Sequence, residues 1–218
     1  MISAIVFDFD GVLADSEPLH LRAYQEVLSS MGVTLPREEY YARYLGYDDE
    51  GVFRALSNDR GWSLTAAQIA TLIGEKTAIL EAMLAGTDVL YPGAAECVER
   101  LASVWPVGVA SGALRHDIQA IVGRHSFQRH FRFIVAAGDT PLSKPAPDPY
   151  RKAAELHGVG APCCLAIEDS RWGIESAKAA GLWCVAITHT YPVAELMAAD
   201  AIVGSLDDIT PDLIRTLG

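Results

Sequence analysis

The first stretch of the chain constrains the fold more than any other. Residues 2–7 form a nearly continuous apolar run, the pattern of a strand buried on both faces of a parallel sheet. The run ends in Asp8, Phe9 and Asp10, and Gly11 follows. Parallel strands need helices on both faces of their sheet, so this run by itself favours an α/β fold.

Asp8 and Asp10 stand two residues apart where this run ends. Residues i and i+2 of an extended chain point the same way, so we expect both carboxylates to project from the strand's C-terminal end. Open α/β sheets bind their ligands at that end. Two adjacent carboxylates suit a divalent metal, acid–base chemistry, or both, because they otherwise repel each other. The alternative is structural, with Asp10 and Gly11 in a tight turn and Asp8 capping the next helix.

The overall composition and charge exclude several classes of protein. Half of the 218 residues are hydrophobic and 21% are charged, which is typical of a globular protein. The net charge of −11 argues against nucleic acid or an anionic membrane as a partner. No apolar run reaches the length of a membrane span, and the N-terminus lacks a basic leader. The four cysteines are Cys97, Cys163, Cys164 and Cys184, and they show neither CxxC pairing nor zinc-ligand spacing. Cysteines of this kind are typical of a reducing compartment, so we expect the protein to be cytoplasmic.

Helical periodicity replaces the strand pattern after the first motif. Apolar residues recur at helical spacing from about residue 16 to Gly32, and no convincing strand follows from Leu35 to about Ala85. Three further helices are predicted, at Arg37–Leu45, Asp49–Ser57 and Thr65–Leu84, with Thr65 capping the last. A block of helices inserted directly after one strand departs from a plain βαβ repeat. We therefore expect a helical cap domain at residues 15–87 and a core made of residues 1–14 and 88–218.

From Tyr91 onward, strands and helices alternate regularly. Strands are predicted at Pro106–Ala110, Phe133–Ala136, Cys163–Ile167, Trp183–Ile187 and Ala201–Val203. The intervening helices are predicted to end near Ser103, Val122, His157 and Ala180, and prolines 145, 147 and 149 are expected to delay helix formation until Tyr150. This alternation predicts a doubly wound, Rossmann-like parallel sheet with helices on both faces.

Polar residues follow four of the predicted strands. They are Asp8 with Asp10, Ser111, Lys144, and Glu168 with Asp169. The carboxyl ends of parallel strands lie along one edge of the sheet and can converge on one cleft. Each residue has an ordinary alternative: Ser111 and the Glu168–Asp169 pair can cap helices, and a lysine is most often solvated. Together they supply carboxylates for a hard cation, a hydroxyl donor and a fixed positive charge, which is what a phosphoryl group and its metal require.

The four segments, in this order, resemble the motifs of the haloacid dehalogenase superfamily of phosphotransferases. DFDGV at Asp8–Val12 is similar to the first motif, Ser111 to the second, Lys144 in KPAPDPY to the third and Glu168–Asp169 to the fourth. The resemblance covers nearly the whole chain, including a helical cap inserted after the first strand. DSEPLH, residues 15–20, and YPG, residues 91–93, resemble the branch of β-phosphoglucomutases and sugar-phosphate phosphatases.

The resemblance implies a role for each matching residue. Asp8 would attack phosphorus and form an aspartyl-phosphate, and Asp10 would protonate the leaving oxygen and later activate water. Mg²⁺ would be bound by Asp8, the backbone carbonyl of Asp10 and Asp169, with Glu168 nearby or bridged through water. The phosphoryl oxygens would be bound by a set comprising Gly11, Ser111, Gly112 and Lys144.

Roles in the cap depend more heavily on the resemblance. His20 matches a histidine that supports the acid–base aspartate in the mutases, and Lys76 matches a sugar-phosphate ligand; the alternatives are a structural histidine and a solvated lysine. The mutases carry an arginine after the position of Gly46, and it binds a second phosphate under the cap. Here Asp48 and Asp49 stand in that segment and should repel such a phosphate.

The leading hypothesis is a Mg²⁺-dependent phosphatase that hydrolyses a small phosphomonoester such as a sugar phosphate. The alternative is a sugar phosphomutase of the β-phosphoglucomutase type. Dehalogenation needs neither a metal nor a leaving-group acid, so Asp10 argues against it. A non-catalytic binding protein would be favoured by the loss of a catalytic residue, and all of them are present. Since an inserted cap can screen the site, a monomer suffices.

Overall fold

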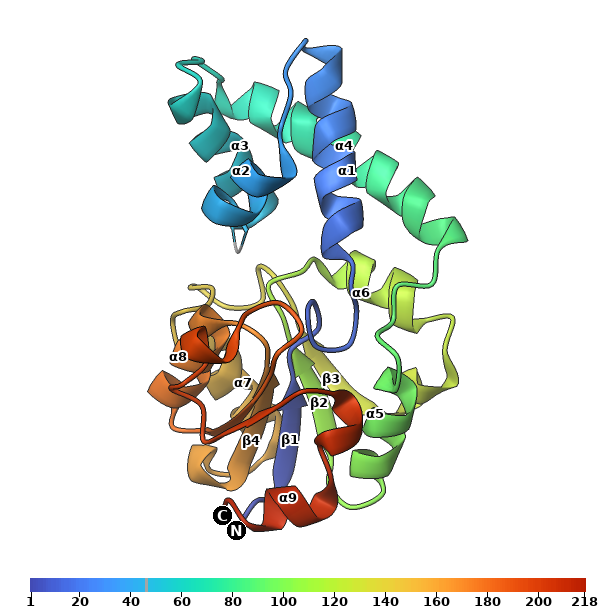
Figure 1. The fold of residues 1–218 in the computed structure, drawn as a ribbon, viewed down its shortest axis with the longest axis vertical. Coiled ribbons are helices and arrows are strands. Elements are labelled where there is room, and N and C mark those ends of the chain that lie inside the picture. The colour runs from blue at the N-terminus through green and yellow to red at the C-terminus, as the bar shows by residue number, and fades with distance from the viewer. Residues whose placement is uncertain (46) are drawn as a thin grey trace. The chain divides into compact units, whose positions relative to one another are not determined.

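A parallel sheet forms the centre of the larger of two compact units. The computed structural model describes residues 1–45 and 47–218 (Figure 1). In the described part of the chain six strands pair in the order β3-β2-β1-β4-β5-β6, and every pairing is parallel. Their bounds are Ala4–Phe7 (β1), Val107–Ala110 (β2), Phe131–Val135 (β3), Cys164–Glu168 (β4), Trp183–Ile187 (β5) and Ala201–Val203 (β6). The predicted doubly wound parallel sheet is confirmed.

The central strands are buried on both faces, as their apolar sequences predict. Every residue of β1, β2 and β4 is buried. Side chains alternate between the faces, so Ala4 and Val6 pack with one helical layer while Ile5 and Phe7 face the other. In Figure 1, α7 (Asp148–His157) and α8 (Arg171–Ala180) cover the first face. The other face packs against α5 (Ala94–Ala102).

Strand register brings the ends of β1, β2 and β4 to one level. Phe7 pairs with Val109 of β2 on one side and with Ile167 of β4 on the other. The residues that follow these strands therefore leave the sheet side by side. The remaining α-helices of this unit are α6 (Arg115–Val122) and α9 (Pro211–Arg215), and short 3₁₀ helices lie at Ser126–His130, Ala161–Cys163, Val193–Glu195 and Leu206–Asp208.

Two helices begin earlier than the sequence predicted. We expected the prolines to prevent helix formation until Tyr150, but α7 begins at Asp148 with Pro149 in its first turn. That expectation is wrong because the N–H groups of a helix's first turn have no acceptor within the helix, so the N–H that Pro149 lacks is not needed there. Likewise we expected the helix that ends near Ala180 to begin at about Gly173, but α8 begins at Arg171, because the side chain of Ser170 caps it by accepting a hydrogen bond from the Gly173 amide.

The second compact unit is helical and consists of residues 16–88; residues 1–15 and 89–218 form the first unit. Its helices are α1 (Glu17–Ser30), α2 (Arg37–Arg43), α3 (Asp49–Asp59) and α4 (Ala66–Gly86). The predicted cap of α4 is confirmed, because Thr65 and Gln68 form a reciprocal capping box. The prediction of helices without strands is also confirmed for the described residues of this unit, and Gly46 lies outside them.

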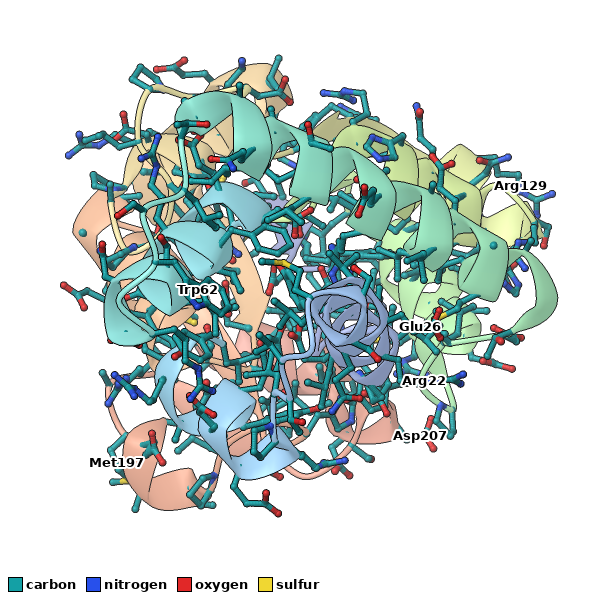
Figure 2. The ribbon with its side chains drawn as sticks, turned by 90° about the horizontal axis from the view of Figure 1, so that it is seen from above. Arg22, Glu26, Trp62, Arg129, Met197 and Asp207 are labelled. Atoms are coloured by element: carbon teal, nitrogen blue, oxygen red, sulfur yellow. The ribbon has the colours of Figure 1, made fainter. Side chains whose placement is uncertain are left out.

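The helical unit has an apolar core of its own. Leu21, Tyr24 and Leu28 of α1 pack with Tyr40, Phe53 and Leu56, while Arg22 and Glu26 lie on the exposed side of α1 (Figure 2). An independent core of this kind is what a separate domain requires. None of the helices in the described part of the chain has both the length and the hydrophobicity of a membrane span.

Candidate active site

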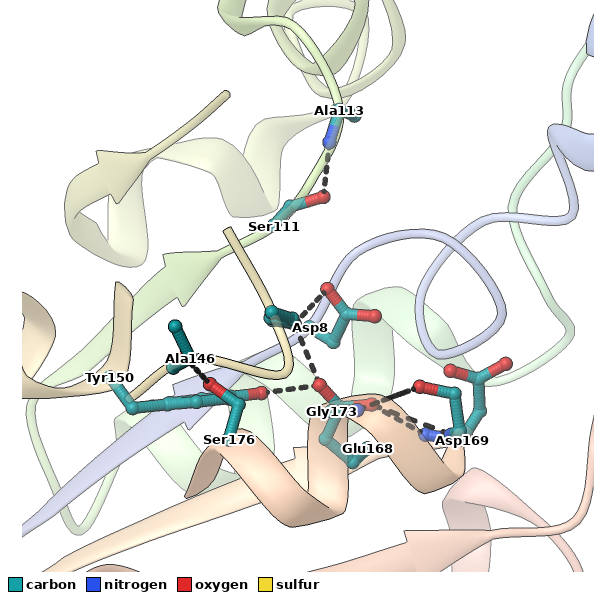
Figure 3. Close-up of polar contacts among 11 residues, drawn as sticks. Asp8, Ser111, Ala113, Ala146, Tyr150, Glu168, Asp169, Gly173 and Ser176 are labelled. Carbon is teal, nitrogen blue, oxygen red and sulfur yellow. Dashed lines mark hydrogen bonds and ion pairs between the residues drawn. The ribbon is translucent and has the colours of Figure 1, made fainter. Parts of the chain in front are cut away.

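Lys144 lies among the carboxylates at the end of β1 and β4. Its Nζ donates to Asp8 Oδ1 at 2.7 Å and to Glu168 Oε1 at 2.6 Å. Figure 3 shows Asp8, Glu168 and Asp169 near one another at this end of the sheet. The side chains of Lys144 and Asp8 are each 12% exposed, and that of Glu168 is fully buried. The alternative of a solvated surface lysine is therefore wrong. Burial lowers the pKa of Lys144, but the carboxylates of Asp8 and Glu168 outweigh it and raise the pKa above its ordinary value.

Glu168 is the most extensively hydrogen-bonded carboxylate of the site. The hydroxyl of Tyr150 donates to Oε1 at 2.6 Å, beside the contact from Lys144. The other oxygen, Oε2, accepts from the amide of Asp169 at 3.2 Å and from the hydroxyl of Ser170 at 3.2 Å. Ser170, not Glu168 or Asp169, accepts the capping hydrogen bond at the start of α8. Glu168 therefore serves to fix Lys144 and the turn after β4.

Burial and mutual repulsion alter the protonation of the neighbouring carboxyls. Burial raises the pKa of Asp8 to about 7, with Glu168 adding to the rise and Lys144 opposing it. The pKa of Asp169 is likewise raised well above its ordinary value, first by burial and then by the charges of Glu168 and Asp8. The carboxyls of Asp8 and Asp169 therefore gain from any cation that can neutralise them.

The carboxylates can hold a metal. Oxygens of Asp8, Glu168 and Asp169 lie within 4.8 Å of one another. The donors are all hard oxygens, which fits a divalent cation such as Mg²⁺, and the raised pKa values of Asp8 and Asp169 mark missing positive charge. Because both oxygens of Glu168 already accept hydrogen bonds, Asp8 and Asp169 are better suited to direct coordination.

Gly11 permits the close approach of Asp169 to the turn after β1. Its φ is +80°, and a Cβ at this position would lie 1.9 Å from Asp169 Oδ2 and 2.8 Å from Thr190 Oγ1. The Thr190 hydroxyl donates to the Asp169 carboxylate and lowers its pKa slightly against the effect of burial. Only glycine fits such a position, both for space and for its backbone conformation.

Asp10 lies in the same turn, one residue before Gly11. It forms an isolated bridge with Ala14, and its charge contributes to the raised pKa of Asp8. The turn alternative for Asp10 and Gly11 is thus correct as local structure. The turn is also compatible with the hypothesis that Asp8 and Asp10 act together, because it keeps Asp10 beside Asp8.

Ser111 and Gly112 lie on the other side of β1, at the end of β2. The hydroxyl of Ser111 accepts from the amide of Ala113 at 3.0 Å, and the Ser111 side chain is buried. Leu114 occupies the N-cap position of the following helix, α6, without a side-chain hydrogen bond, so the interpretation of Ser111 as its N-cap is wrong. A shallow hollow is lined by Ser111, Gly112 and Lys144, so the structure brings these three predicted residues together.

The two predicted residues of the helical unit, His20 and Lys76, contact each other. The Lys76 ammonium lies 2.9 Å from His20 Nδ1 and donates to Asp49 Oδ1 at 2.8 Å. The Lys76 side chain is 1% exposed, so the alternative of a solvated lysine is wrong. Burial, followed by the charge of Lys76, lowers the pKa of His20 to about 3, which keeps the ring neutral and lets Nδ1 accept.

Asp48 and Asp49 have separate roles in the helical unit. Asp48 caps α3 by accepting from the Gly51 amide at 2.8 Å. Asp49 Oδ1 accepts from Lys76 and from the Tyr24 hydroxyl, the latter at 2.6 Å, and Oδ2 is buried with no hydrogen-bond partner among the described residues. The carboxylate of Asp49 therefore neutralises the one buried lysine of this unit within the described chain.

Several residues of the site carried no signal in the sequence. Tyr150, Ser170 and Gly173 surround Glu168, and Thr190 contacts Asp169. They belong to two helices and one loop that only the tertiary structure brings to the strand ends. The capping role was assigned to Glu168 and Asp169 instead of Ser170, and the contact of Ser170 with Glu168 was not predicted either.

A family model for haloacid dehalogenase-like hydrolases matches residues 2–181. The protein CbbY of Rhodobacter capsulatus is 32% identical over 200 residues, which cover 87% of this chain and 87% of that protein. Hexitol phosphatase B of Escherichia coli strain K12 is 30% identical over 216 residues, covering 96% of this chain and 95% of the relative.

Solved structures of similar proteins have the same fold as this chain. A crystal structure of CbbY from Rhodobacter sphaeroides in complex with xylulose-1,5-bisphosphate has a TM-score of 0.86 at 28% identity and covers 96% of each chain. A β-phosphoglucomutase from Clostridium difficile has a TM-score of 0.88 at 19% identity and covers 99% of this chain and 96% of its own. The second likeness supports the fold alone.

Gly173 provides a test of how closely α8 must approach Glu168. A Cβ at Gly173 would lie 1.9 Å from Glu168 Oε1, so Gly173→Ala should displace the carboxylate or the helix and destabilise the fold by about 1–3 kcal/mol. The matched control is Gly74→Ala in α4, where no atom lies within 4 Å and alanine should stabilise by about 0.5–1 kcal/mol. Urea unfolding measures both changes; equal effects of the two substitutions would contradict this account of Gly173.

Proposed function

The chain belongs to the haloacid dehalogenase-like hydrolase family, and on that basis we propose that it hydrolyses phosphomonoesters of small metabolites, sugar phosphates in particular. The observation that carries the proposal is Asp8: a buried carboxylate at the end of the central strand, in contact with Lys144 and beside further acids. A carboxylate can attack a phosphoryl group only where positive charge offsets the repulsion between the two anions.

A Mg²⁺ ion is the proposed cofactor. Asp8, Asp169 and the backbone carbonyl of Asp10 would hold it, and Glu168 would contact it through water. When bound, the ion supplies positive charge to the phosphoryl oxygens during the transfer. Lys144 supplies the second positive charge, and Ser111, Gly11 and Gly112 complete the phosphate-binding set.

The proposed reaction has two steps. Asp8 attacks phosphorus and forms an aspartyl-phosphate, while the bond from phosphorus to the sugar oxygen breaks and Asp10 gives that oxygen a proton. In the second step Asp10 takes a proton from water, which attacks the same phosphorus. The bond from Asp8 to phosphorus then breaks, inorganic phosphate leaves, and Asp8 is free again.

The relatives guide the proposed substrate class. One of them is named a hexitol phosphatase, and a CbbY structure contains a sugar bisphosphate. For this chain we favour a sugar or polyol monophosphate. Asp49 already compensates the charge of Lys76, so Lys76 does not offer a second phosphate an unpaired cation. The same pairing weighs against a phosphomutase, which must bind a bisphosphate in two orientations.

The proposal extends to the organisation of the protein. The unit of residues 16–88 would be the cap domain, with His20 and Lys76 as its contributions to substrate binding, and the unit of residues 1–15 and 89–218 would be the catalytic core. A single chain contains every residue of the proposed mechanism, so a monomer suffices. The net charge of −11 disfavours nucleic acid and anionic membranes as partners, and the free cysteines fit the cytoplasm.

Asp8→Asn is expected to abolish hydrolysis, with at least about a thousandfold loss, because an amide oxygen is a poor nucleophile. The assay follows phosphate release from a panel of phosphorylated sugars with Mg²⁺, and mass spectrometry of acid-quenched enzyme locates the phosphate adduct. The control is Asp212→Asn, since that side chain is 94% exposed and lies outside the site. A folded Asp8→Asn protein with most of its activity, or an adduct on another residue, would refute the proposed nucleophile.

Asp49→Asn tests the preference for monophosphates. Removing the charge leaves Lys76 unpaired, so we expect the dissociation constant of a sugar bisphosphate to fall by about fivefold to tenfold while monophosphate binding changes less. The matched control is Asp48→Asn. Asp48 was also expected to repel a second phosphate, but it is exposed and caps α3, so this substitution changes the net charge equally and should leave bisphosphate binding unchanged. Efficient conversion of glucose 1-phosphate to glucose 6-phosphate by the unmodified protein would show that the chain is a mutase instead.

A further inference from the structure

The turn that carries Asp10 is hydrogen-bonded internally at Phe9 and Ala14. The Gly11 amide donates to the Ala14 carbonyl at 2.8 Å, and the Ala14 amide donates to the Phe9 carbonyl at 3.0 Å. The Phe9 carbonyl also accepts from the Leu13 amide at 2.8 Å and from the Val12 amide at 3.3 Å, and none of these four bonds uses the carbonyl of Gly11. The direction of the Asp10 side chain depends on this backbone, because Asp10 directly precedes Gly11.

His189 holds the turn at Gly11. It belongs to the loop after β5, and its Nδ1 lies 2.9 Å from the Gly11 carbonyl oxygen. A carbonyl can only accept, so Nδ1 carries the proton and donates to Gly11. The next residue, Thr190, donates to Asp169, so one short loop contacts both the turn and a proposed metal ligand.

Tyr91 holds the same turn at Leu13. Its amide donates to the Leu13 carbonyl at 3.0 Å, and the neighbouring residue Leu90 bridges to Ala14. The Tyr91 ring stacks on the imidazole of His189, with ring centroids 3.9 Å apart and an interplanar angle of 25°. The stack joins the two supports: the His189 side chain holds the turn at Gly11, the Tyr91 backbone amide holds it at Leu13, and the rings of the two residues pack on each other.

We propose that His189, braced by Tyr91, is a positioning residue for Asp10. By holding the Gly11 carbonyl it keeps the turn in the conformation from which Asp10 delivers its proton to the leaving oxygen. This inference rests on the proposed phosphatase function. His189 is not proposed to contact the substrate. Any loss of activity on removing its side chain should therefore arise because Asp10 is no longer held in position.

The experiment compares two substrates whose leaving groups differ in their need for a proton. An aryl phosphate such as 4-nitrophenyl phosphate leaves without protonation, whereas glycerol phosphate needs it. His189→Phe keeps a ring beside Tyr91 but has no donor. We expect it to lower kcat/KM for glycerol phosphate by about tenfold to a hundredfold, part of what a general acid supplies, and that for the aryl phosphate by less than about threefold.

Two further variants separate positioning from a structural role. His189→Asn places an amide N–H near the position of Nδ1 and should restore most of the activity on glycerol phosphate. His125→Phe makes the same exchange at a half-buried histidine that packs on Phe127 before β3. It should leave kcat/KM unchanged for both substrates. A loss at His189→Phe that is equal for both substrates, or that His189→Asn does not relieve, would overturn the proposal.

A double mutant tests the route through Asp10. In an Asp10→Asn background the proton donor is already missing. Adding His189→Phe should therefore lower kcat/KM for glycerol phosphate by less than a further factor of about two. Fully additive losses would overturn the assignment. The failure of the underlying function is distinguishable, because unmodified protein that hydrolyses neither substrate refutes the phosphatase, whereas active protein with an unchanged substrate ratio refutes only His189.

Discussion

The ion pairs of Lys144 with Asp8 and Glu168 are the interactions on which the rest of the site depends. Three carboxylates lie within 4.8 Å of one another in a buried place, and one ammonium group contacts two of them. Without that charge, repulsion and burial would protonate the acids or force them apart. The site is therefore an arrangement of buried negative charge that is only partly compensated, which is what makes it fit to take up a cation and a phosphoryl group.

The fold supplies this arrangement through the sheet and the two helices on one of its faces, α7 and α8. Register brings Asp8 and Glu168 to adjacent strand ends, and Tyr150 of α7 and the start of α8 hold Glu168 in place. Further along the Lys144 loop, the Ser176 hydroxyl of α8 donates to the Ala146 carbonyl at 2.5 Å. Helices α7 and α8 thus cover one face of the sheet and also hold Glu168 and the loop of Lys144 in place.

The residues that follow strands could be predicted from the sequence, because parallel topology alone places Asp8, Ser111 and Glu168 at one edge. The pairing of Lys76 with Asp49 could not, since it joins α3 to α4 through side chains that no periodicity relates. The early start of α7 was missed because a run of prolines was read as excluding helix. The contact of His189 with Gly11 depends on a loop whose course the sequence does not reveal.

The pH dependence of Mg²⁺ binding, measured by titration calorimetry, tests this account most directly. The pKa of Asp8 is raised to about 7, so at pH 6 the cation must displace a proton that is largely absent at pH 8. Affinity should rise by about tenfold from pH 6 to pH 8, with proton release on binding at the lower pH. Equal affinity at both pH values without proton release would contradict the claim that partly compensated, buried carboxylates hold the metal.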